Sequence, residues 1–507
     1  MLTVNQLTLT HRKDLTVLVD SLSFTLNDGE RLALIGEEGN GKSTLLRVLA
    51  GDPSVESYIE VSGSFSCRDS AAYLPQELPE SERTLSAYDF FCMSPVFFDQ
   101  SPRELGELAA RLSLPADVFY SDQLMQTFSG GERVKLQLAR LLMSSPTTLL
   151  LDEPTNDLDS DSVLWLENFL LSCKLTVLFV SHDEVLLSRA ATSILLLERL
   201  RRRQVPRATL YRMGYDRFYE ERGAAFEKQT RIARKEREDF SAKMERYDAI
   251  RRKVERDQNA ISRQDPHGSR LLKKKMHTVQ AMGRRFEREQ ENMTAMPEQE
   301  EAIFAKLDCA PLPADKTVLD LSCAELSVGG RTLCRNIRLT VRANEKLCIC
   351  GHNGVGKSTL LHLIRDTLEK RDDLRVFYMP QDAGDLLDFS LSPVELLSPS
   401  GEKEERSRAG ILLGSMKFTA DEMNHPSAGL SGGQKAKLMF LMMAQSGANV
   451  LLLDEPSRNL SPLSGPVIRE LLAEYPGCII AVSHDRRLIR DVCTRTVELT
   501  PEGVRPS

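Results

Sequence analysis

The chain has 507 residues, which at about 100 to 200 residues per domain corresponds to two or three domains. Hydrophobic residues make up 41% and charged residues 27%, a mixture that excludes a chain disordered over its whole length. The net charge of −7 excludes a protein that is basic throughout, and the ten cysteines include no CxxC pair that would indicate a metal site. Because the sequence carries no signal-peptide pattern and no apolar run of about 18 residues, we expect a cytoplasmic protein.

The first segment, residues 1–206, predicts a nucleotide-binding domain. Residues 31–35 are typical of a strand and residues 45–49 of a helix, and the loop between them has the pattern G-x-x-x-x-G-K-S. Glycines let such a loop turn its backbone N–H groups toward phosphates, and the helix N-terminus adds partial positive charge. We expect Lys42 to reach the β- and γ-phosphates of ATP and Ser43 to bind Mg²⁺. The expected phosphate-binding residues are Gly36, Glu37, Glu38, Gly39, Asn40, Gly41, Lys42, Ser43 and Thr44.

The residue types at three positions farther along this segment predict that the bound triphosphate is hydrolysed. Asp152 ends an apolar, strand-like run, the position of a carboxylate that holds hydrated Mg²⁺. Glu153 follows it directly and can orient or deprotonate the attacking water. His182 follows another apolar run and a serine, and it can donate a hydrogen bond to the γ-phosphate.

The middle segment, residues 207–314, predicts a basic helical linker. Residues 221–291 hold 20 Lys and Arg and 13 Asp and Glu, a net charge of +7 that leaves −14 for the rest of the chain. Near the expected bend, residues 251–288 carry 12 basic and 4 acidic residues, and this excess of one sign favours an RNA partner over a merely solvated face.

Apolar heptads in this segment predict an antiparallel coiled coil whose first helix covers residues 215–262. Asp265-Pro266-His267-Gly268 predicts the turn between its helices, within a tip near residues 259–270. The heptad positions are Phe226, Ala233, Phe240, Tyr247, Val254, Ile261, Leu272, Val279, Phe286 and Met293.

The last segment, residues 315–507, repeats the first. Asp454 and Glu455 stand where Asp152 and Glu153 stand in the first segment, and His484 follows Glu455 by the same 29 positions as His182 follows Glu153. Motifs in the same order at matching distances predict two copies of one domain. The second copy's expected phosphate-binding residues are Gly351, His352, Asn353, Gly354, Val355, Gly356, Lys357, Ser358 and Thr359, with Ser358 and Asp454 on the metal and Glu455 and His484 in catalysis.

Both copies also carry a Ser-Gly-Gly motif before a predicted helix, at Ser129-Gly130-Gly131 and at Ser431-Gly432-Gly433. These motifs resemble the signature of the ABC ATPase superfamily. The resemblance implies that each signature closes over ATP held by the other copy, so that two composite sites form. It also implies that Gln76 and Gln381 are Q-loop glutamines, which approach the metal and the attacking water.

Two departures from that superfamily bear on the sites. Asp159 matches the family's D-loop, whereas Ser461 does not, so the two sites need not hydrolyse ATP at equal rates. The aromatic residue that usually stacks on adenine is absent: His11 stands near that position in the first copy and Val328-Gly329-Gly330 in the second. Triphosphate binding is therefore predicted more firmly than selectivity for adenine.

Over essentially its whole length the chain resembles the ABC-F family. The resemblance implies an α/β fold with two tandem ABC-type P-loop ATPase domains joined by an antiparallel α-helical coiled-coil linker. Residues 454–464 and 260–268 resemble the antibiotic-resistance subset, whose members bind the 70S ribosome at the tRNA exit site. The resemblance implies that the chain contacts large-subunit rRNA and tRNA through the linker and uses ATP and Mg²⁺ as cofactors. The expected form is a monomer whose two ABC domains pair within the chain, without a membrane subunit.

Other functions stay open at this point. A housekeeping ABC-F translation factor would share the ATPase but give no drug phenotype. The tandem ATPase subunit of a membrane importer also has two ABC domains, but it lacks a long basic coiled coil between them. A DNA-maintenance ATPase would carry its coiled coil inside one nucleotide-binding domain. Cosedimentation with ribosomes separates these classes.

Overall fold

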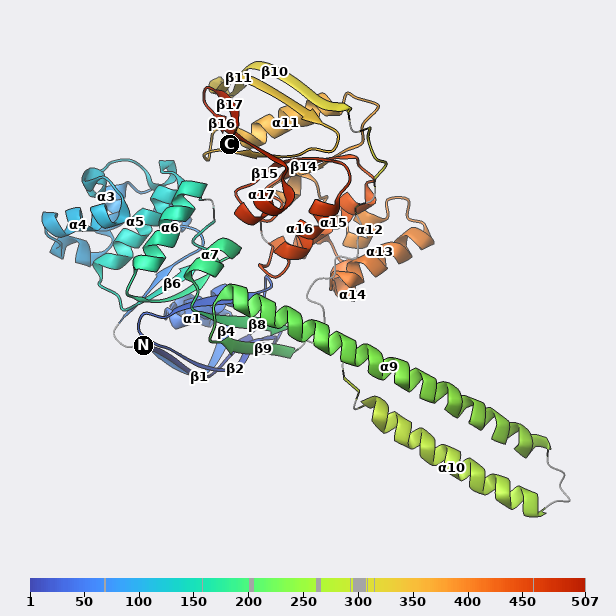
Figure 1. Cartoon of the computed structure of the whole chain (residues 1–507). Coiled ribbons are helices and arrows are strands. Elements are labelled where there is room, and N and C mark those ends of the chain that lie inside the picture. Colours follow the sequence, from blue (N-terminus) through green and yellow to red (C-terminus); the bar gives the residue numbers. More distant parts are fainter. Residues whose placement is uncertain are drawn as a thin grey trace. The chain divides into compact units, whose positions relative to one another are not determined.

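The computed structural model describes the chain except for residues 68–69, 157, 200–204, 261–265, 292, 295–306, 308, 314, 459 and 507, and side chains are not described at 258–260, 266–269, 272, 290 and 291. The described residues form two compact units, which Figure 1 colours by sequence. One unit comprises Met1–Tyr215 and Glu300–Ser507, and the other comprises Asp216–Gln299.

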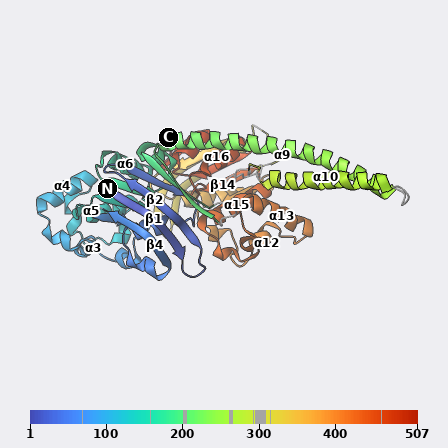
Figure 2. The same ribbon diagram turned by 90° about the horizontal axis from the view of Figure 1, so that it is seen from below.

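The first copy is built on a sheet with the strand order β5-β6-β7-β3-β8-β9, parallel except for β9. Its central strands are continuous apolar runs because helices cover both faces of a parallel sheet. Strands β1, β2 and β4 form a separate antiparallel layer, seen side by side in Figure 2. The strands are β1 (Leu2–His11), β2 (Val17–Leu26), β3 (Arg31–Gly36), β4 (Ile59–Cys67), β5 (Ala71–Leu74), β6 (Thr148–Asp152), β7 (Thr176–Val180), β8 (Ser193–Arg199) and β9 (Val205–Tyr211). The helices are α1 (Lys42–Leu49), α2 (Glu80–Arg83), α3 (Ala87–Cys92), α4 (Pro102–Leu112), α5 (Gly130–Met143), α6 (Ser160–Ser172) and α7 (Glu184–Ala190).

The second copy repeats this topology, with the order β13-β14-β15-β12-β16-β17 and an antiparallel pair β10-β11. In both copies the strand before the phosphate loop and the strand that ends at the acidic pair are parallel and flank one common strand, β7 or β15, so the loop and the acidic pair meet at one edge of the sheet. The strands are β10 (Thr317–Val328), β11 (Arg331–Arg342), β12 (Lys346–Cys350), β13 (Val376–Met379), β14 (Val450–Asp454), β15 (Cys478–Val482), β16 (Arg495–Thr500) and β17 (Gly503–Pro506). The helices are α11 (Lys357–Leu368), α12 (Pro393–Leu397), α13 (Lys403–Ser415), α14 (Ala420–Asn424), α15 (Gly432–Gln445), α16 (Gly465–Glu474) and α17 (Arg486–Val492).

Within the first unit a group of buried charges joins the two copies. Glu184, at the start of α7, accepts hydrogen bonds from Arg469 of α16 at 2.6 and 3.0 Å, and both side chains are less than a tenth exposed. Arg487 of α17 donates to the same carboxylate at 2.9 Å, and Asp491 lies 3.1 Å from Arg469. Gly465 makes room for this group, because a Cβ there would lie 2.2 Å from Glu184 Oε1.

The other unit consists of two long helices, α9 (Tyr215–Ala260), which begins in the first unit, and α10 (Pro266–Glu291). They lie side by side in both views, and the Phe286 ring contacts those of Phe240 and Tyr247 at 6.3 and 5.6 Å between centroids. The heptad positions with described side chains are buried or half-buried: Phe226, Ala233, Phe240, Tyr247, Val254, Val279, Phe286 and Met293.

The prediction of a turn at residues 265–268 is wrong for three of its four residues. Pro266 is the first residue of α10, and His267 and Gly268 continue that helix. Proline is favoured at the first helical position, because its missing N–H has no partner there and its φ is already helical. Residues 261–265, at the centre of the predicted tip, lie outside the described residues.

Strand β9 extends across residue 206 and pairs with β8. The predicted boundary after residue 206 thus falls inside this strand. The division of the chain into residues 1–206, 207–314 and 315–507 stays a prediction. Among the helices that the structure describes, none combines the length and the apolar composition that crossing a membrane requires.

Candidate functional site

The first phosphate loop joins β3 to α1 as expected. Gly39 and Gly41 adopt φ values of 76° and 84°, which L side chains rarely tolerate, and this backbone directs the start of α1 toward the loop. The Lys42 ammonium donates to the carbonyls of Gly36 at 2.8 Å and Glu37 at 3.1 Å. Burial lowers the pKa of Lys42. The loop thus presents a cation and a helix N-terminus to one small volume, which suits a triphosphate.

The other predicted residues of the first site surround this loop. Ser43 Oγ donates to Asp152 Oδ1 at 3.1 Å, so the two expected Mg²⁺ ligands are adjacent. Tyr73 OH donates to the other oxygen of Asp152 at 3.1 Å, a contact that no sequence pattern predicted. Asn40 is buried and donates to the Leu197 carbonyl, which fixes the loop rather than leaving the amide for a ligand. A cavity of about 330 Å³ is lined by Leu18, Glu38, Gly39, Gly41, Lys42, Ser43, Thr44, Gln76, Glu153, Asn156, His182 and Arg458.

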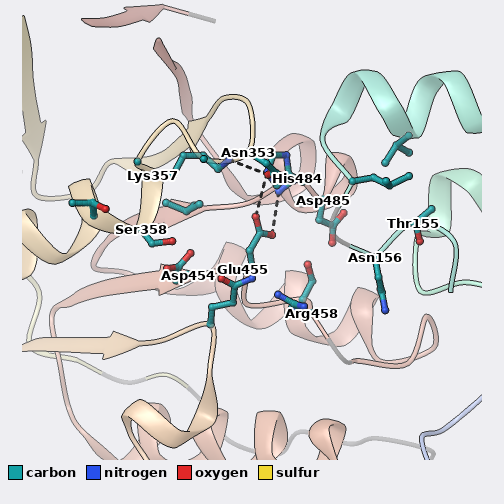
Figure 3. Close-up of a pocket in the computed structure, with 18 of the residues that line it drawn as sticks. Thr155, Asn156, Asn353, Lys357, Ser358, Asp454, Glu455, Arg458, His484 and Asp485 are labelled. Atoms are coloured by element: carbon teal, nitrogen blue, oxygen red, sulfur yellow. Dashed lines mark hydrogen bonds and ion pairs between the residues drawn. The ribbon is translucent and has the colours of Figure 1, made fainter. Parts of the chain in front are cut away.

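The second phosphate loop has the same form. Gly354 and Gly356 have φ values of 79° and 103°, and Lys357 donates to the carbonyls of Gly351 at 2.8 Å and His352 at 3.0 Å. Asn353 Oδ1 lies 3.5 Å from the Lys357 ammonium, whereas Val355 packs on the apolar core of its copy. Figure 3 shows Lys357 beside Asn353 in the cavity at this second loop.

The second set of metal ligands also fits the predicted ion. Asp454 is buried, and its Oδ1 accepts no hydrogen bond from the described residues, so an oxygen is available for a cation. Ser358, Thr359 and Gln381 line the same cavity, which has a volume of about 680 Å³. Figure 3 shows Ser358 and Asp454 on one side of it and Asn156 of the first copy on the other. The donor set of hydroxyl, amide and carboxylate oxygens suits Mg²⁺.

The two carboxylate–histidine pairs differ in geometry. In the first copy His182 Nε2 lies 2.8 Å from Glu153 Oε1, and His182 Nδ1 donates to the Leu460 carbonyl of the second copy. In the second copy His484 Nε2 is 3.7 Å from Glu455 Oε1, and both ring nitrogens are buried without a hydrogen-bond partner among the described residues. The first pair is therefore held from both sides, whereas the second is not.

The pKa values of these groups follow that difference. Burial alone would raise the pKa of Glu153 and lower that of His182, but their mutual attraction reverses both directions, so the pKa of Glu153 is lowered and that of His182 is raised. Burial raises the pKa of Glu455 to about 7. Burial and the nearby Lys357 lower the pKa of His484 to about 4. The surroundings thus favour the charged forms of the first pair, whereas burial favours the neutral forms of the second.

Both glutamates have strained backbone. Glu153 and Glu455 adopt φ values of 48° and 49°, the left-handed region that non-glycine residues rarely occupy. Each accepts a hydrogen bond from a backbone N–H at 3.2 Å, that of His182 in the first copy and that of His484 in the second. Strain at matching positions in both copies points to a side chain retained for function.

The two signature motifs lie in different surroundings. Gly433 donates its backbone N–H to Glu38 Oε2 at 2.5 Å, so the second signature contacts the first phosphate loop. Ser431 and Gly432 are half-buried at this contact. The exposed Ser129 caps α5 together with Glu132, and neither it nor the adjoining Gly130 and Gly131 lines the cavity at the second loop. Among the described residues, the second signature thus contacts the opposite phosphate loop, whereas the first signature does not line the cavity at the second loop.

Residues from the opposite copy complete the lining of both cavities. Asn156, His182 and Arg458 line both, and only His182 was expected at a site. Asp159 caps α6 and lies 3.2 Å from His352 of the second loop. Val328, Arg331 and Leu333 line the second cavity near the expected base position, whereas His11 does not line the first. Asn156 and Arg458 stand at the same position in the two copies, three residues after Glu153 and Glu455. This matching position is the sequence pattern that could have predicted them as site residues.

Comparisons with known proteins show which family, relatives and fold the chain resembles. A family model described as ABC transporter matches residues 19–156 and 334–458. The chain is 30% identical to ABC transporter F family member 4 of Arabidopsis thaliana over 94% of this chain and 70% of that protein. It is 26% identical to the probable ATP-binding protein YheS of Escherichia coli K12, over 94% of this chain and 76% of that protein. The archaeal ribosome recycling factor aABCE1, solved with the stalk protein aP1, shares the fold with a TM-score of 0.61 at 17% identity, over 99% of this chain and 89% of that one.

Proposed function

Because the chain belongs to the ABC-F family of ATP-binding cassette proteins, we propose that it binds the 70S ribosome and protects the peptidyl-transferase centre from antibiotics. The protein is an ATPase, which converts ATP and water to ADP and phosphate. In the proposed cycle, binding of ATP holds the two ABC domains together, and hydrolysis lets them separate. The contact of the second signature with the first phosphate loop supports this pairing within one chain.

The residues at each site have distinct proposed roles. Lys42 and Lys357 bind the β- and γ-phosphates, and bound Mg²⁺ neutralises phosphate charge as the terminal phosphoryl group is transferred. Ser43 with Asp152, and Ser358 with Asp454, would hold that ion, and Gln76 and Gln381, which line the two cavities, would add amide oxygens to it. The carboxylate next to each aspartate orients the attacking water, and the following histidine donates to the γ-phosphate. The proposed carboxylates and histidines are Glu153, Glu455, His182 and His484.

The observation that carries ribosome binding is the charge of the helical unit. Lys273, Lys274 and Lys275 are exposed on consecutive positions of α10. Residues 221–291 are basic in a chain that is acidic elsewhere, and such a surface attracts the phosphates of RNA. The packing of Phe286 against Phe240 and Tyr247 supports the further proposal that α9 and α10 form an antiparallel coiled coil.

Protection against antibiotics is proposed in addition to ribosome binding. It follows from the resemblance of residues 454–464 and 260–268 to the resistance subset, whose linkers enter through the tRNA exit site. The linker tip would then displace lincosamides, pleuromutilins and streptogramin A, either directly or by moving tRNA and rRNA. A housekeeping ABC-F translation factor is the alternative, and it differs only in giving no drug phenotype.

The test begins with ribosome binding. Purified protein is sedimented with 70S ribosomes in the presence of ATP, as wild type and as the double variant Glu153→Gln, Glu455→Gln. The amide keeps the shape of each carboxylate but takes no proton from water, so the variant should retain ATP and remain on ribosomes longer than wild type. Absence of both proteins from the ribosome pellet at low salt would contradict the proposal.

Bacterial strains that express the protein then separate protection from a housekeeping role. Expression of the wild type should raise the minimum inhibitory concentrations of a lincosamide, a pleuromutilin and a streptogramin A. Replacing Arg263, Gln264 and His267 with Ala, chosen from the sequence alone, should remove protection at matched expression with ATPase activity intact. Ribosome binding without any rise in these concentrations would identify the housekeeping alternative.

A further inference from the structure

The first residue of the linker helix α9 is tied to the loop that holds the first catalytic histidine. Tyr215 is fully buried, and its hydroxyl donates to the Pro462 carbonyl at 3.1 Å. Two residues earlier in the same loop, the Leu460 carbonyl accepts from His182 Nδ1. His182 Nε2 then lies 2.8 Å from Glu153 Oε1. These three contacts lead from the start of α9 to the carboxylate proposed to orient water.

We infer that Tyr215 is a positioning residue for hydrolysis at the first site, because its hydroxyl fixes the loop whose Leu460 carbonyl orients the His182 ring against Glu153. A hydrogen bond on one ring nitrogen of a histidine fixes the tautomer and the direction in which the other nitrogen points. The inference rests on the proposed catalytic role of Glu153 and His182. It adds that displacement at the base of α9 changes the rate at this site.

The loop itself is built to transmit such a displacement. Leu460, Ser461 and Pro462 are all buried, so the loop has little freedom to move independently of its neighbours. The Ser461 carbonyl accepts from the Ser464 N–H at 2.9 Å, which closes the loop into a tight turn. The guanidinium of Arg487 lies 5.8 Å from the centre of the Tyr215 ring and also binds Glu184, which holds the ring in place.

The second site gives the contrast. His484 has no hydrogen-bond partner on either ring nitrogen among the described residues, and its Nε2 is 3.7 Å from Glu455. No described residue therefore accepts a hydrogen bond from the His484 ring as the Leu460 carbonyl does from the His182 ring. A contact that acts through the Leu460 carbonyl on the His182 ring is therefore expected to alter the first site more than the second.

The experiment removes one hydroxyl. Tyr215→Phe keeps the buried ring and removes the hydroxyl that donates to the Pro462 carbonyl. Tyr475→Phe is the matched control, because Tyr475 is also buried and its hydroxyl donates to a backbone carbonyl, that of Ala448 at 2.8 Å, away from both cavities. Single-turnover hydrolysis of prebound ATP is measured for each variant, along with the KM for ATP and the thermal unfolding midpoint.

Tyr215→Phe should lower the single-turnover rate about three- to tenfold, the range that corresponds to one hydrogen bond, with KM and unfolding midpoint equal to those of Tyr475→Phe. The fall should be present in a Glu455→Gln background and absent in a Glu153→Gln background. Equal falls in both backgrounds, or a rate matching that of Tyr475→Phe, would overturn the inference. A Glu153→Gln change that leaves the rate of the Glu455→Gln variant unaltered would instead refute the proposed role of Glu153.

Discussion

The buried charges between the two copies predict that adding a single methyl group at Gly465 destabilises the protein. Gly465 is the first residue of α16, and a Cβ there would lie 2.2 Å from Glu184 Oε1 and 3.0 Å from Arg469 Nη1. Its φ is not in the left-handed region, so Gly465→Ala meets no backbone strain. The Glu184 carboxylate must therefore move, and it gives up its bonds of 2.6 and 3.0 Å to Arg469.

Two effects of opposite sign decide the magnitude. Alanine is favoured over glycine in a helix by up to about 1 kcal/mol. Removing one partner of a buried ion pair costs about 3 to 5 kcal/mol, which is an upper limit here because Arg487 stays bonded to Glu184 and Asp491 stays beside Arg469. Since the loss of the pair still outweighs the helix preference, the free energy of unfolding should fall, by at most about 4 kcal/mol.

Urea unfolding, followed through the fluorescence of Trp165, the single tryptophan, measures the stability of the first copy. Gly106→Ala in α4 is the matched control, because a Cβ at that glycine meets no atom within 4 Å. Gly106→Ala should stabilise the protein slightly, whereas Gly465→Ala should unfold at lower urea. A Gly465→Ala variant at least as stable as the control would show that the Glu184–Arg469 pair contributes nothing to stability.

Two further predictions concern the sites and the helical unit. Glu153→Gln and Glu455→Gln should lower ATP turnover to different extents. Among the described residues, a carbonyl of the other copy holds His182 but not His484, and the second signature contacts the first phosphate loop at Glu38. Equal residual turnover in ATPase assays would argue against unequal sites. Replacing Lys273, Lys274 and Lys275 with Gln should weaken ribosome binding and flatten its dependence on salt by about 0.7 to 0.9 in logarithmic slope per lost phosphate contact. The same charge change at Lys403, Arg406 and Arg408 of α13 should leave that slope unchanged in cosedimentation across a salt series.

The sequence was sufficient to predict the elements that hold the phosphates. A strand, a glycine loop and a helix must follow one another within a few residues, so the pattern around Lys42 and Lys357 specifies its own structure. Asp152 and Asp454 were predictable for the same reason, since each ends an apolar strand that must be buried in a parallel sheet.

Contacts between the copies were not predictable in this way. His182 meets Leu460, and Glu184 meets Arg469, only because two separately folded copies are docked in one arrangement. No local pattern records that arrangement, since residues so far apart in the chain are related only through the packing of whole domains. The start of α10 was missed for a different reason: proline followed by glycine is typical of turns, yet proline equally suits the first position of a helix.

The left-handed backbone at Glu153 and Glu455 has a consequence for anyone who optimises this protein. Each residue carries a conformational cost of about 1 to 2 kcal/mol that glycine would not carry. A search for substitutions that stabilise the fold would therefore favour glycine at both positions. Such a design would gain thermal resistance while discarding the carboxylates on which ATP turnover is proposed to depend, so these two positions must be held fixed before stability is improved elsewhere.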